Sequence, residues 1–164
     1  MGCGKEEIVS HTQTITDYLI ENQNQFYRYA FSCLHNREEA LDAVQTAVCR
    51  ALEREGTLRN PDAVRTWFYR ILVNVCTDAL RVRSRTVPFP DAEVSYEDPA
   101  PEGDLARRVD GLTPEIGTVI KLRFYEELSL KEIAAVTGCN INTVKTRLYT
   151  GLRQLRVTLE GELE

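Results

Sequence analysis

A regularly spaced row of polar side chains marks the segment between residues 60 and 85. Its members recur at intervals of four, three and four residues, so a helix would carry them on one face: Arg70, Asn74, Thr77 and Arg81. Arginine and asparagine hydrogen-bond to the edges of nucleic-acid bases, and arginine also binds phosphate. Tyr69 stands beside the row, and a tyrosine ring can stack on an unpaired base. The row indicates a nucleic-acid surface, although a solvated helix face would show the same spacing.

A second set of polar side chains lies near the C-terminus. Apolar residues recur there at helical spacing and predict a buried stripe: Ile141, Val144, Leu148, Leu152 and Leu155. The side chains that would then face outward are Asn142, Thr143, Lys145, Thr146, Arg147 and Tyr149. Small polar and basic residues at the start of a helix suit the major groove of DNA. An ordinary solvated helix in a bundle is the alternative.

The residues that precede this helix favour the DNA interpretation. Ser129 and Glu132 have capping-box spacing and predict a short helix over residues 130–136 that ends at Gly138. Asn140 then caps the longer helix. A short helix, a tight turn and a longer helix form a helix-turn-helix, whose second helix enters the major groove.

Three helices are predicted in the N-terminal part, and the third carries the row around Asn74. The first covers about residues 16–34. The second begins after its cap Asn36 and ends at Gly56, with an apolar row at helical spacing: Leu41, Val44, Val48 and Leu52. The third begins at Pro61 and reaches about residue 83, and its buried face should hold Val64, Trp67, Phe68, Ile71, Leu72, Val75 and Leu80.

The segment of residues 84–104 separates the two helical parts. It contains four prolines, and six acidic residues against one arginine, a composition that disfavours regular structure. After it, Pro114 predicts the start of a new helix. The predicted fold is therefore all-α, with two small helical domains, 1–83 and 105–164, joined by an acidic proline-rich linker, 84–104. The second domain contains the helix-turn-helix.

The charge distribution bears on how such a protein could bind DNA. The net charge is −5, and the linker holds the acidic excess, which leaves both predicted domains near neutrality. Near-neutral modules bind free DNA weakly, because affinity comes largely from neutralising phosphates. A DNA reader of this composition is expected to work with a larger partner that supplies affinity.

Several other classes of protein are disfavoured. Hydrophobic residues make up 43% of the chain, which is enough for a packed core, but no apolar run approaches the length that spans a membrane. The five cysteines form no CxxC pair, which indicates reduced thiols in the cytosol. The residues offer no catalytic constellation and no metal-ligand spacing. We expect neither enzymatic activity nor a cofactor or metal.

Three segments, taken in order, resemble the extracytoplasmic-function sigma factors, a group of the sigma-70 family. Residues 38–52, EEALDAVQTAVCRAL, resemble the helix of that family that binds RNA polymerase. Residues 60–85 resemble its promoter-melting segment, with Trp67, Asn74 and an arginine-rich end in register. Residues 112–148 are similar to its reader of the upstream promoter element, with EIA and TVKTRL as the signature.

The resemblance implies a role for each set of residues. Asp42 and Gln45 would dock on the clamp coiled coil of core RNA polymerase. The loop around Leu58 and the helix that carries Tyr69, Arg70, Asn74, Thr77 and Arg81 would capture a base flipped from the −10 element of promoter DNA. The helix that follows Asn140 would read the −35 element. The resemblance also implies an anti-sigma factor as a partner, and we expect a cytoplasmic protein that is monomeric when free.

Two other functions fit part of the chain. A plain helix-turn-helix regulator that does not recruit polymerase would explain the C-terminal domain, but not the helix around Asn74 or the acidic linker. The other alternative is a helical interaction protein, such as a decoy or adaptor that binds polymerase but no promoter. A mass measurement and a polymerase pull-down would separate these functions from that of a sigma factor.

Overall fold

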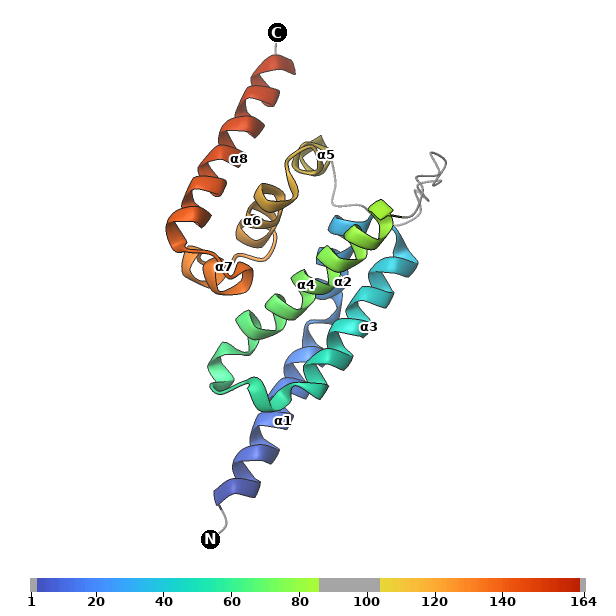
Figure 1. Ribbon diagram of the computed structural model, residues 1–164, viewed down its shortest axis with the longest axis vertical. Helices are drawn as coiled ribbons and strands as arrows, with labels where there is room; N and C mark the ends of the chain where they lie inside the picture. Colours follow the sequence, from blue (N-terminus) through green and yellow to red (C-terminus); the bar gives the residue numbers. More distant parts are fainter. Residues whose placement is uncertain (1–2, 86–103, 163–164) are drawn as a thin grey trace. The chain divides into compact units, whose positions relative to one another are not determined.

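The computed structural model describes residues 3–85 and 104–162, and every regular element within them is helical (Figure 1). The chain divides into two compact units, Met1–Ser95 and Tyr96–Glu164. The predicted all-α class with two helical domains is confirmed. Most of the predicted linker, from residue 86 to residue 103, lies outside the described residues.

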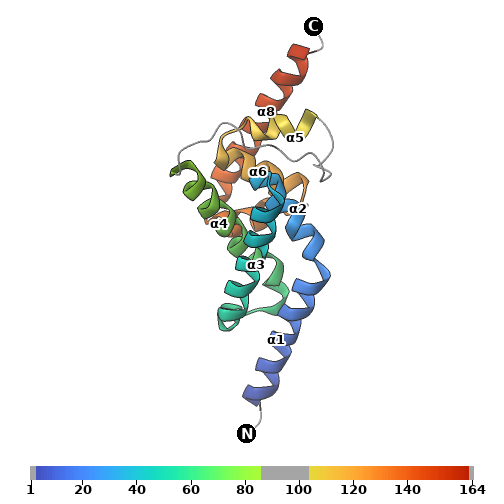
Figure 2. The ribbon, with the colours of Figure 1, turned by 90° about the vertical axis from the view of Figure 1, so that its right-hand side faces the viewer.

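The described part of the first unit contains α-helices and short 3-10 turns. They are α1 (Cys3–Glu21), α2 (Gln23–Leu34), α3 (Arg37–Glu53), η1 (Glu55–Thr57), η2 (Pro61–Ala63) and α4 (Val64–Arg85). Helices α2, α3 and α4 pack against one another, and α1 packs on α4. The N-terminal end of α1 projects beyond the other helices of this unit (Figure 2).

The prediction of one continuous helix over residues 16–34 is wrong, because the helix breaks at Asn22. The backbone of Asn22 has φ −114° and ψ 15°. Its side-chain Nδ2 donates a hydrogen bond to the carbonyl oxygen of Tyr18 over 2.8 Å. Asparagine side chains compete with the backbone in this way, which disfavours them inside helices.

Helix α3 begins as predicted but buries a different face. The Asn36 side chain accepts a hydrogen bond from the Glu39 amide over 3.0 Å. The buried residues of α3 are Ala40, Ala43, Ala47 and Ala51, whereas Leu41 and Leu52 of the predicted apolar row are 43% and 45% exposed. Alanines let α3 pack closely against both α2 and α4, and the apolar row is left on the outer side of the helix.

An aromatic cluster at the centre of the first unit fixes the orientation of α4. Its members are Tyr18, Phe26, Tyr29, Phe68 and Tyr69. The ring centroids of Phe26 and Phe68 are 4.3 Å apart. The predicted burial of Phe68, Ile71, Leu72 and Val75 is confirmed, while Val64, Trp67 and Leu80 are half-buried. Burying this face of α4 directs its opposite face outward.

The described part of the second unit comprises α5 (Asp104–Asp110), α6 (Pro114–Phe124), α7 (Leu130–Thr137) and α8 (Ile141–Glu162). The predicted capping box forms, since the Ser129 side chain accepts from the Glu132 amide and the Glu132 side chain accepts from the Ser129 amide, each over 3.1 Å. Gly138 ends α7 with φ 71°, a left-handed conformation that glycine adopts without steric cost. The predicted helix-turn-helix is confirmed as α7, this turn and α8.

Helix α8 packs closely on α6 through a glycine. Val144, Leu148 and Leu155 are buried as predicted, but Ile141 and Leu152 are more exposed than the predicted stripe requires. Gly151 occupies the contact, and a Cβ atom there would lie 2.8 Å from Ile116 Cγ2. The close approach fixes the direction in which the start of α8 presents its polar side chains.

Candidate nucleic-acid interface

The polar row predicted on α4 is present on the outward face of that helix. Arg70, Asn74 and Arg81 are exposed, and the guanidinium-bearing side chain of Arg81 is 71% exposed. Thr77 is half-buried, and its hydroxyl donates a hydrogen bond to the Val73 carbonyl over 2.8 Å. The row therefore offers two guanidinium groups and one amide at its surface, and a threonine whose donor is already used.

Two of the residues predicted for this surface point inward. Tyr69 is 1% exposed, and its ring packs edge-on against Phe26 and Tyr29. The prediction that Tyr69 stacks on an unpaired base is wrong, because the ring forms part of the core. Leu58 is 3% exposed, so its side chain anchors the loop in which it lies and is not available for contact with DNA. Tyr69 was assigned to this surface because it is next to Arg70 in the sequence. Neighbouring residues of a helix point in different directions, so adjacency did not place Tyr69 on the same face.

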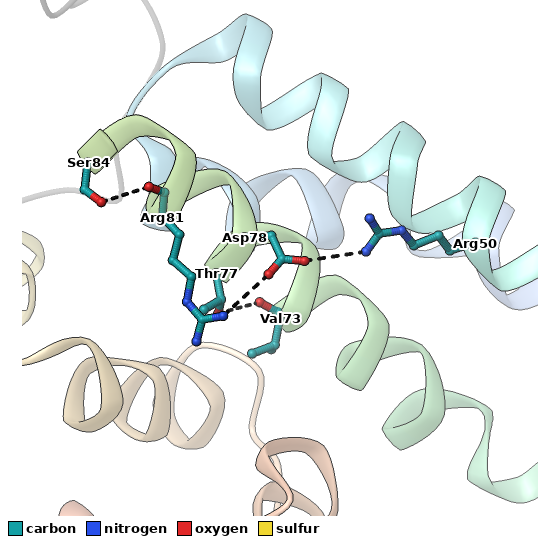
Figure 3. Close-up of polar contacts among 6 residues, drawn as sticks. All are labelled: Arg50, Val73, Thr77, Asp78, Arg81 and Ser84. Carbon is teal, nitrogen blue, oxygen red and sulfur yellow. Dashed lines mark hydrogen bonds and ion pairs between the residues drawn. The ribbon is translucent and has the colours of Figure 1, made fainter. Parts of the chain in front are cut away.

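An arginine from a neighbouring helix joins the row, and sequence spacing did not reveal it. Asp78 of α4 lies between Arg50 of α3 and Arg81 of α4, with each arginine Nη1 3.9 Å from a carboxylate oxygen (Figure 3). Exposed ion pairs of this kind contribute little to stability. These ion pairs instead affect position, because Asp78 keeps the guanidinium groups of Arg50 and Arg81 at the edge of the polar row. Only the packing of α3 on α4 brings Arg50 there.

The outer face of α3 has a different chemistry. Asp42 and Gln45 are exposed, and they are bordered by the predicted apolar row, of which Leu41 and Leu52 are exposed and Val44 and Val48 are half-buried. A polar pair beside partly exposed apolar side chains is typical of surfaces that bind another protein. We call this surface the α3 outer face.

The start of α8 presents most of the side chains predicted for the major groove. Asn142, Thr143, Lys145, Thr146 and Tyr149 are exposed. Arg147 is half-buried, and its Nη1 lies 3.3 Å from Cys139 Sγ in the preceding turn. The Thr146 hydroxyl donates a hydrogen bond to the Asn142 carbonyl over 2.9 Å. Lys145 is therefore the exposed cation of this surface, and Arg147 is shared between the surface and the turn.

The described part of the chain offers no metal site and no membrane-spanning helix. No group of three or more metal-ligating side chains occurs among those residues. None of the helices in residues 3–85 and 104–162 has the length and apolar character needed to cross a membrane. Burial raises the pKa of the Tyr125 phenol, with a contribution from the negative charge of Asp110, but this residue belongs to neither polar surface.

Two family models match the chain, one in each unit. The model described as Sigma-70 region 2 matches residues 19–86, and the model described as Sigma-70, region 4 matches residues 102–155. The chain belongs to the sigma-70 family of RNA polymerase sigma factors. Region 2 thus spans α2, α3 and α4, and region 4 contains the helix-turn-helix.

Curated relatives agree with this assignment over most of the chain. RNA polymerase sigma factor SigV of Bacillus subtilis is 40% identical over 149 residues, which cover 88% of this chain and 90% of that protein. The RNA polymerase sigma-E factor of Streptomyces avermitilis is 30% identical, over 88% of this chain and 84% of that protein. The ECF RNA polymerase sigma factor SigW of Bacillus subtilis is 28% identical over 84% of each chain. The predicted membership of the extracytoplasmic-function group is confirmed.

Solved structures share the fold. The sigma factor RpoE from Bartonella quintana, solved in complex with the anti-sigma factor NepR, has a TM-score of 0.70 and 24% identity over 88% of this chain and 97% of that chain. CnrH, solved in complex with the cytosolic domain of CnrY, has a TM-score of 0.69 and 20% identity over 94% of this chain and 97% of that chain.

Family membership decides between the functions that the sequence left open. Sigma factors are transcription initiation factors that recruit RNA polymerase, so this chain is not an enzyme. A plain helix-turn-helix regulator is not favoured, because region 2 occupies the first unit.

Proposed function

We propose that this sigma factor divides promoter recognition between its two units, with region 2 opening the −10 element and region 4 reading the −35 element. The observation that carries the proposal is the outward face of α4, where Arg70, Asn74 and Arg81 are exposed opposite a rigid aromatic core. Flipping a base out of the stack costs a few kcal/mol. Hydrogen bonds from this face to the trapped base and its phosphates offset that cost, so the duplex opens without ATP.

The α3 outer face is proposed to dock on the clamp coiled coil of core RNA polymerase. Asp42 and Gln45 supply polar contacts, and Leu41 and Leu52 supply exposed apolar surface beside them. Burial of the exposed parts of these leucines against a partner would favour association. This surface lies on a different helix from the polar row of α4, which leaves that row available for DNA.

The start of α8 is proposed to enter the major groove of the −35 element. Asn142, Thr143 and Lys145 lie in its first turns, where a recognition helix contacts bases. Thr146, Arg147 and Tyr149 follow and are proposed to contact the DNA backbone or flanking bases.

The proposed working form is a complex with polymerase. Residues 84–104 are proposed to link the two domains, 1–83 and 105–164, and their acidic excess leaves each domain near neutrality. Near-neutral domains bind free promoter DNA weakly, so we expect a cytoplasmic monomer that acts once core polymerase has bound it. An anti-sigma factor is a further proposed partner, as in the complex of RpoE with NepR.

The proposal is tested by transcription with purified core polymerase on a library of genomic fragments. We expect the protein to direct initiation from a small set of fragments that core polymerase alone does not use. Potassium permanganate should then detect unpaired thymines at the −10 element. Tight sequence-specific binding of DNA by the isolated protein, without any effect on polymerase, would contradict the proposal.

A further inference from the structure

The loop of residues 55–60 between α3 and α4, called the α3–α4 loop below, is fastened within itself. The Thr57 amide donates to the Arg54 carbonyl over 2.8 Å, and the Leu58 amide donates to the Glu55 carbonyl over 3.2 Å. The side chain of Leu58 is buried and pins the middle of the loop. At the end of the loop, Asn60 caps η2 by accepting from the Asp62 amide over 3.0 Å. These contacts leave the loop few alternative conformations.

The hydroxyl group of Thr57 joins the loop to α4. It donates a hydrogen bond to the Arg54 carbonyl over 2.7 Å and accepts one from Trp67 Nε1 over 2.9 Å. An indole has a single N–H donor, so this bond fixes the orientation of the Trp67 ring together with that of the hydroxyl. The loop and the first turn of α4 therefore keep a defined relation to each other.

Trp67 also ties the loop to the polar row. It precedes Arg70 by three residues and Asn74 by seven, so it occupies the same face of α4, one and two turns earlier. The α3–α4 loop, bonded to Trp67, stands at the N-terminal end of that row. A base bound against Arg70 and Asn74 would therefore lie on the face of α4 that the loop borders at its N-terminal end.

Helix α1 also contacts the loop. The Thr12 hydroxyl donates a hydrogen bond to Glu55 Oε2 over 3.1 Å, across 43 residues of sequence. Ile15 and Leu19, in the following turns of α1, are buried and hold this part of the helix in place. The loop is thus held from α4 by Trp67 and from α1 by Thr12.

We propose that Thr57 and Trp67 are positioning residues that set base preference at the −10 element, with Thr12 and Glu55 as an outer brace. Neither pair needs to touch DNA. A receptor that is already ordered does not lose conformational freedom when the base arrives, and it distinguishes bases by shape because it cannot adapt to each of them. The inference rests on the proposed capture of an extruded base by region 2.

The test compares Thr57→Val with the wild type in holoenzyme assembled on core polymerase. Valine keeps the branched shape but loses the hydroxyl. The probe is a pool of duplexes whose pre-melted non-template segment is randomised, and sequencing of bound and unbound fractions gives the base preference at each position. The matched control is Thr118→Val in α6, whose hydroxyl also bonds a carbonyl, that of Pro114 over 2.8 Å, but far along the sequence from the loop. Thermal unfolding of each free variant is measured in parallel.

We expect Thr57→Val to lower the preference for the favoured base by roughly fivefold, the effect of one neutral hydrogen bond, with little change in melting temperature. Trp67→Phe should act in the same direction, and the double variant should be no worse than either single one, because both remove the same bond. Glu55→Ala should reduce the preference, and Glu55→Gln, which keeps an acceptor, should restore it. Thr118→Val should match the wild type.

The outcomes distinguish failure of the proposed base capture from failure of the positioning role of Thr57 and Trp67. If wild-type holoenzyme shows no base preference in the pre-melted segment, the proposed base capture itself fails. If the wild type has a preference and Thr57→Val and Trp67→Phe keep it, base capture stands and the positioning role is overturned. Equal losses of binding to every sequence, including a duplex with an abasic site, would also overturn it, because they indicate a general effect on binding.

Discussion

The guanidinium group of Arg147 lies against the thiol of Cys139, with Nη1 3.3 Å from Sγ. This contact joins α8 to the turn that precedes it, in which the Cys139 thiol in turn points to the Thr137 carbonyl at 3.8 Å. Lys145, two residues before Arg147, is exposed. The two basic residues at the start of α8 therefore differ, since the Arg147 side chain also contacts the preceding turn, whereas Lys145 is exposed.

Lys145→Ala and Arg147→Ala should consequently give different phenotypes. Both should weaken use of the −35 element, and Lys145→Ala should relax the sequence preference at one position of that element, at a cost of about 1–3 kcal/mol, the effect of one lost base contact. Arg147→Ala should in addition lower the melting temperature of the second unit. Promoters with pre-melted DNA should be spared in both cases. Equal defects on pre-melted templates would place the fault in folding or polymerase binding.

On α4, Arg70→Ala and Asn74→Ala should impair duplex opening more than formation of the closed complex. Both side chains are exposed, so their removal should leave the fold intact. Each lost base contact should cost about 1–3 kcal/mol. Permanganate reactivity of the −10 thymines measures opening, and Arg28→Ala, an exposed arginine of α2, is the control. Unchanged reactivity in both α4 variants would remove these residues from the melting role.

Arg81 and Arg83 form a matched pair that separates DNA binding from stability. Arg83 donates to the Leu34 carbonyl over 2.8 Å and pairs with Glu39, so it ties the end of α4 to α2 and α3. Arg83→Ala should lower the free energy of unfolding by about 1 kcal/mol, a modest value because the group is partly exposed. Arg81→Ala should leave the melting temperature nearly unchanged but weaken promoter opening. A lower melting temperature for Arg81→Ala, with impaired promoter opening for Arg83→Ala only, would contradict both assignments.

Local signals in the sequence were sufficient to predict the helix-turn-helix. Ser129, Glu132 and Gly138 act within a few residues of one another, and the structure uses each of them as predicted. Asn22 was a local signal of the opposite kind, an asparagine inside the helix predicted over residues 16–34. Its side-chain bond to the Tyr18 carbonyl accompanies the break in that helix.

Contacts between helices explain what the sequence could not predict. Helix α3 carries a row of alanines on one face and a row that includes Leu41 and Leu52 on another. Hydrophobicity alone predicts that the leucines are buried. The close packing of α3 on α2 and α4 buries the alanines instead. Arg50 reaches the polar row only through that same packing. Tyr69 had the chemistry of a base-stacking residue, but three neighbouring aromatic rings from α2 and α4 enclose it.

Gly151→Ala should destabilise the second unit. The new Cβ would lie 2.8 Å from Ile116 Cγ2 and 2.9 Å from Ile120 Cδ1, closer than carbon atoms can approach. Isoleucine is branched at Cβ and yields little, so α8 must move away from α6 at a cost of about 1–3 kcal/mol. Gly56→Ala is the control, because a Cβ at residue 56 meets no atom within 4 Å. Thermal unfolding should show a lower melting temperature for the first variant only.

Replacing the exposed leucines of the α3 outer face should affect polymerase binding more than stability. A buried leucine such as Leu72 should cost about 2–5 kcal/mol of stability when truncated to alanine. Leu41 and Leu52 are 43% and 45% exposed, so Leu41→Ser and Leu52→Ser should lower the melting temperature much less than Leu72→Ala does.

The same two substitutions should nevertheless reduce the affinity for core polymerase, because they remove apolar surface that the proposed clamp contact would bury. Gln45→Ala, beside them, should add to the loss without affecting stability. Fluorescence anisotropy of labelled protein titrated with core polymerase measures the affinity, and Glu38→Ala, at the exposed start of α3, is the comparison. A fall in melting temperature as large as that of Leu72→Ala, without a change in affinity, would show that Leu41 and Leu52 belong to the core in solution. Unchanged values of both would show that the α3 outer face is not the docking surface for polymerase.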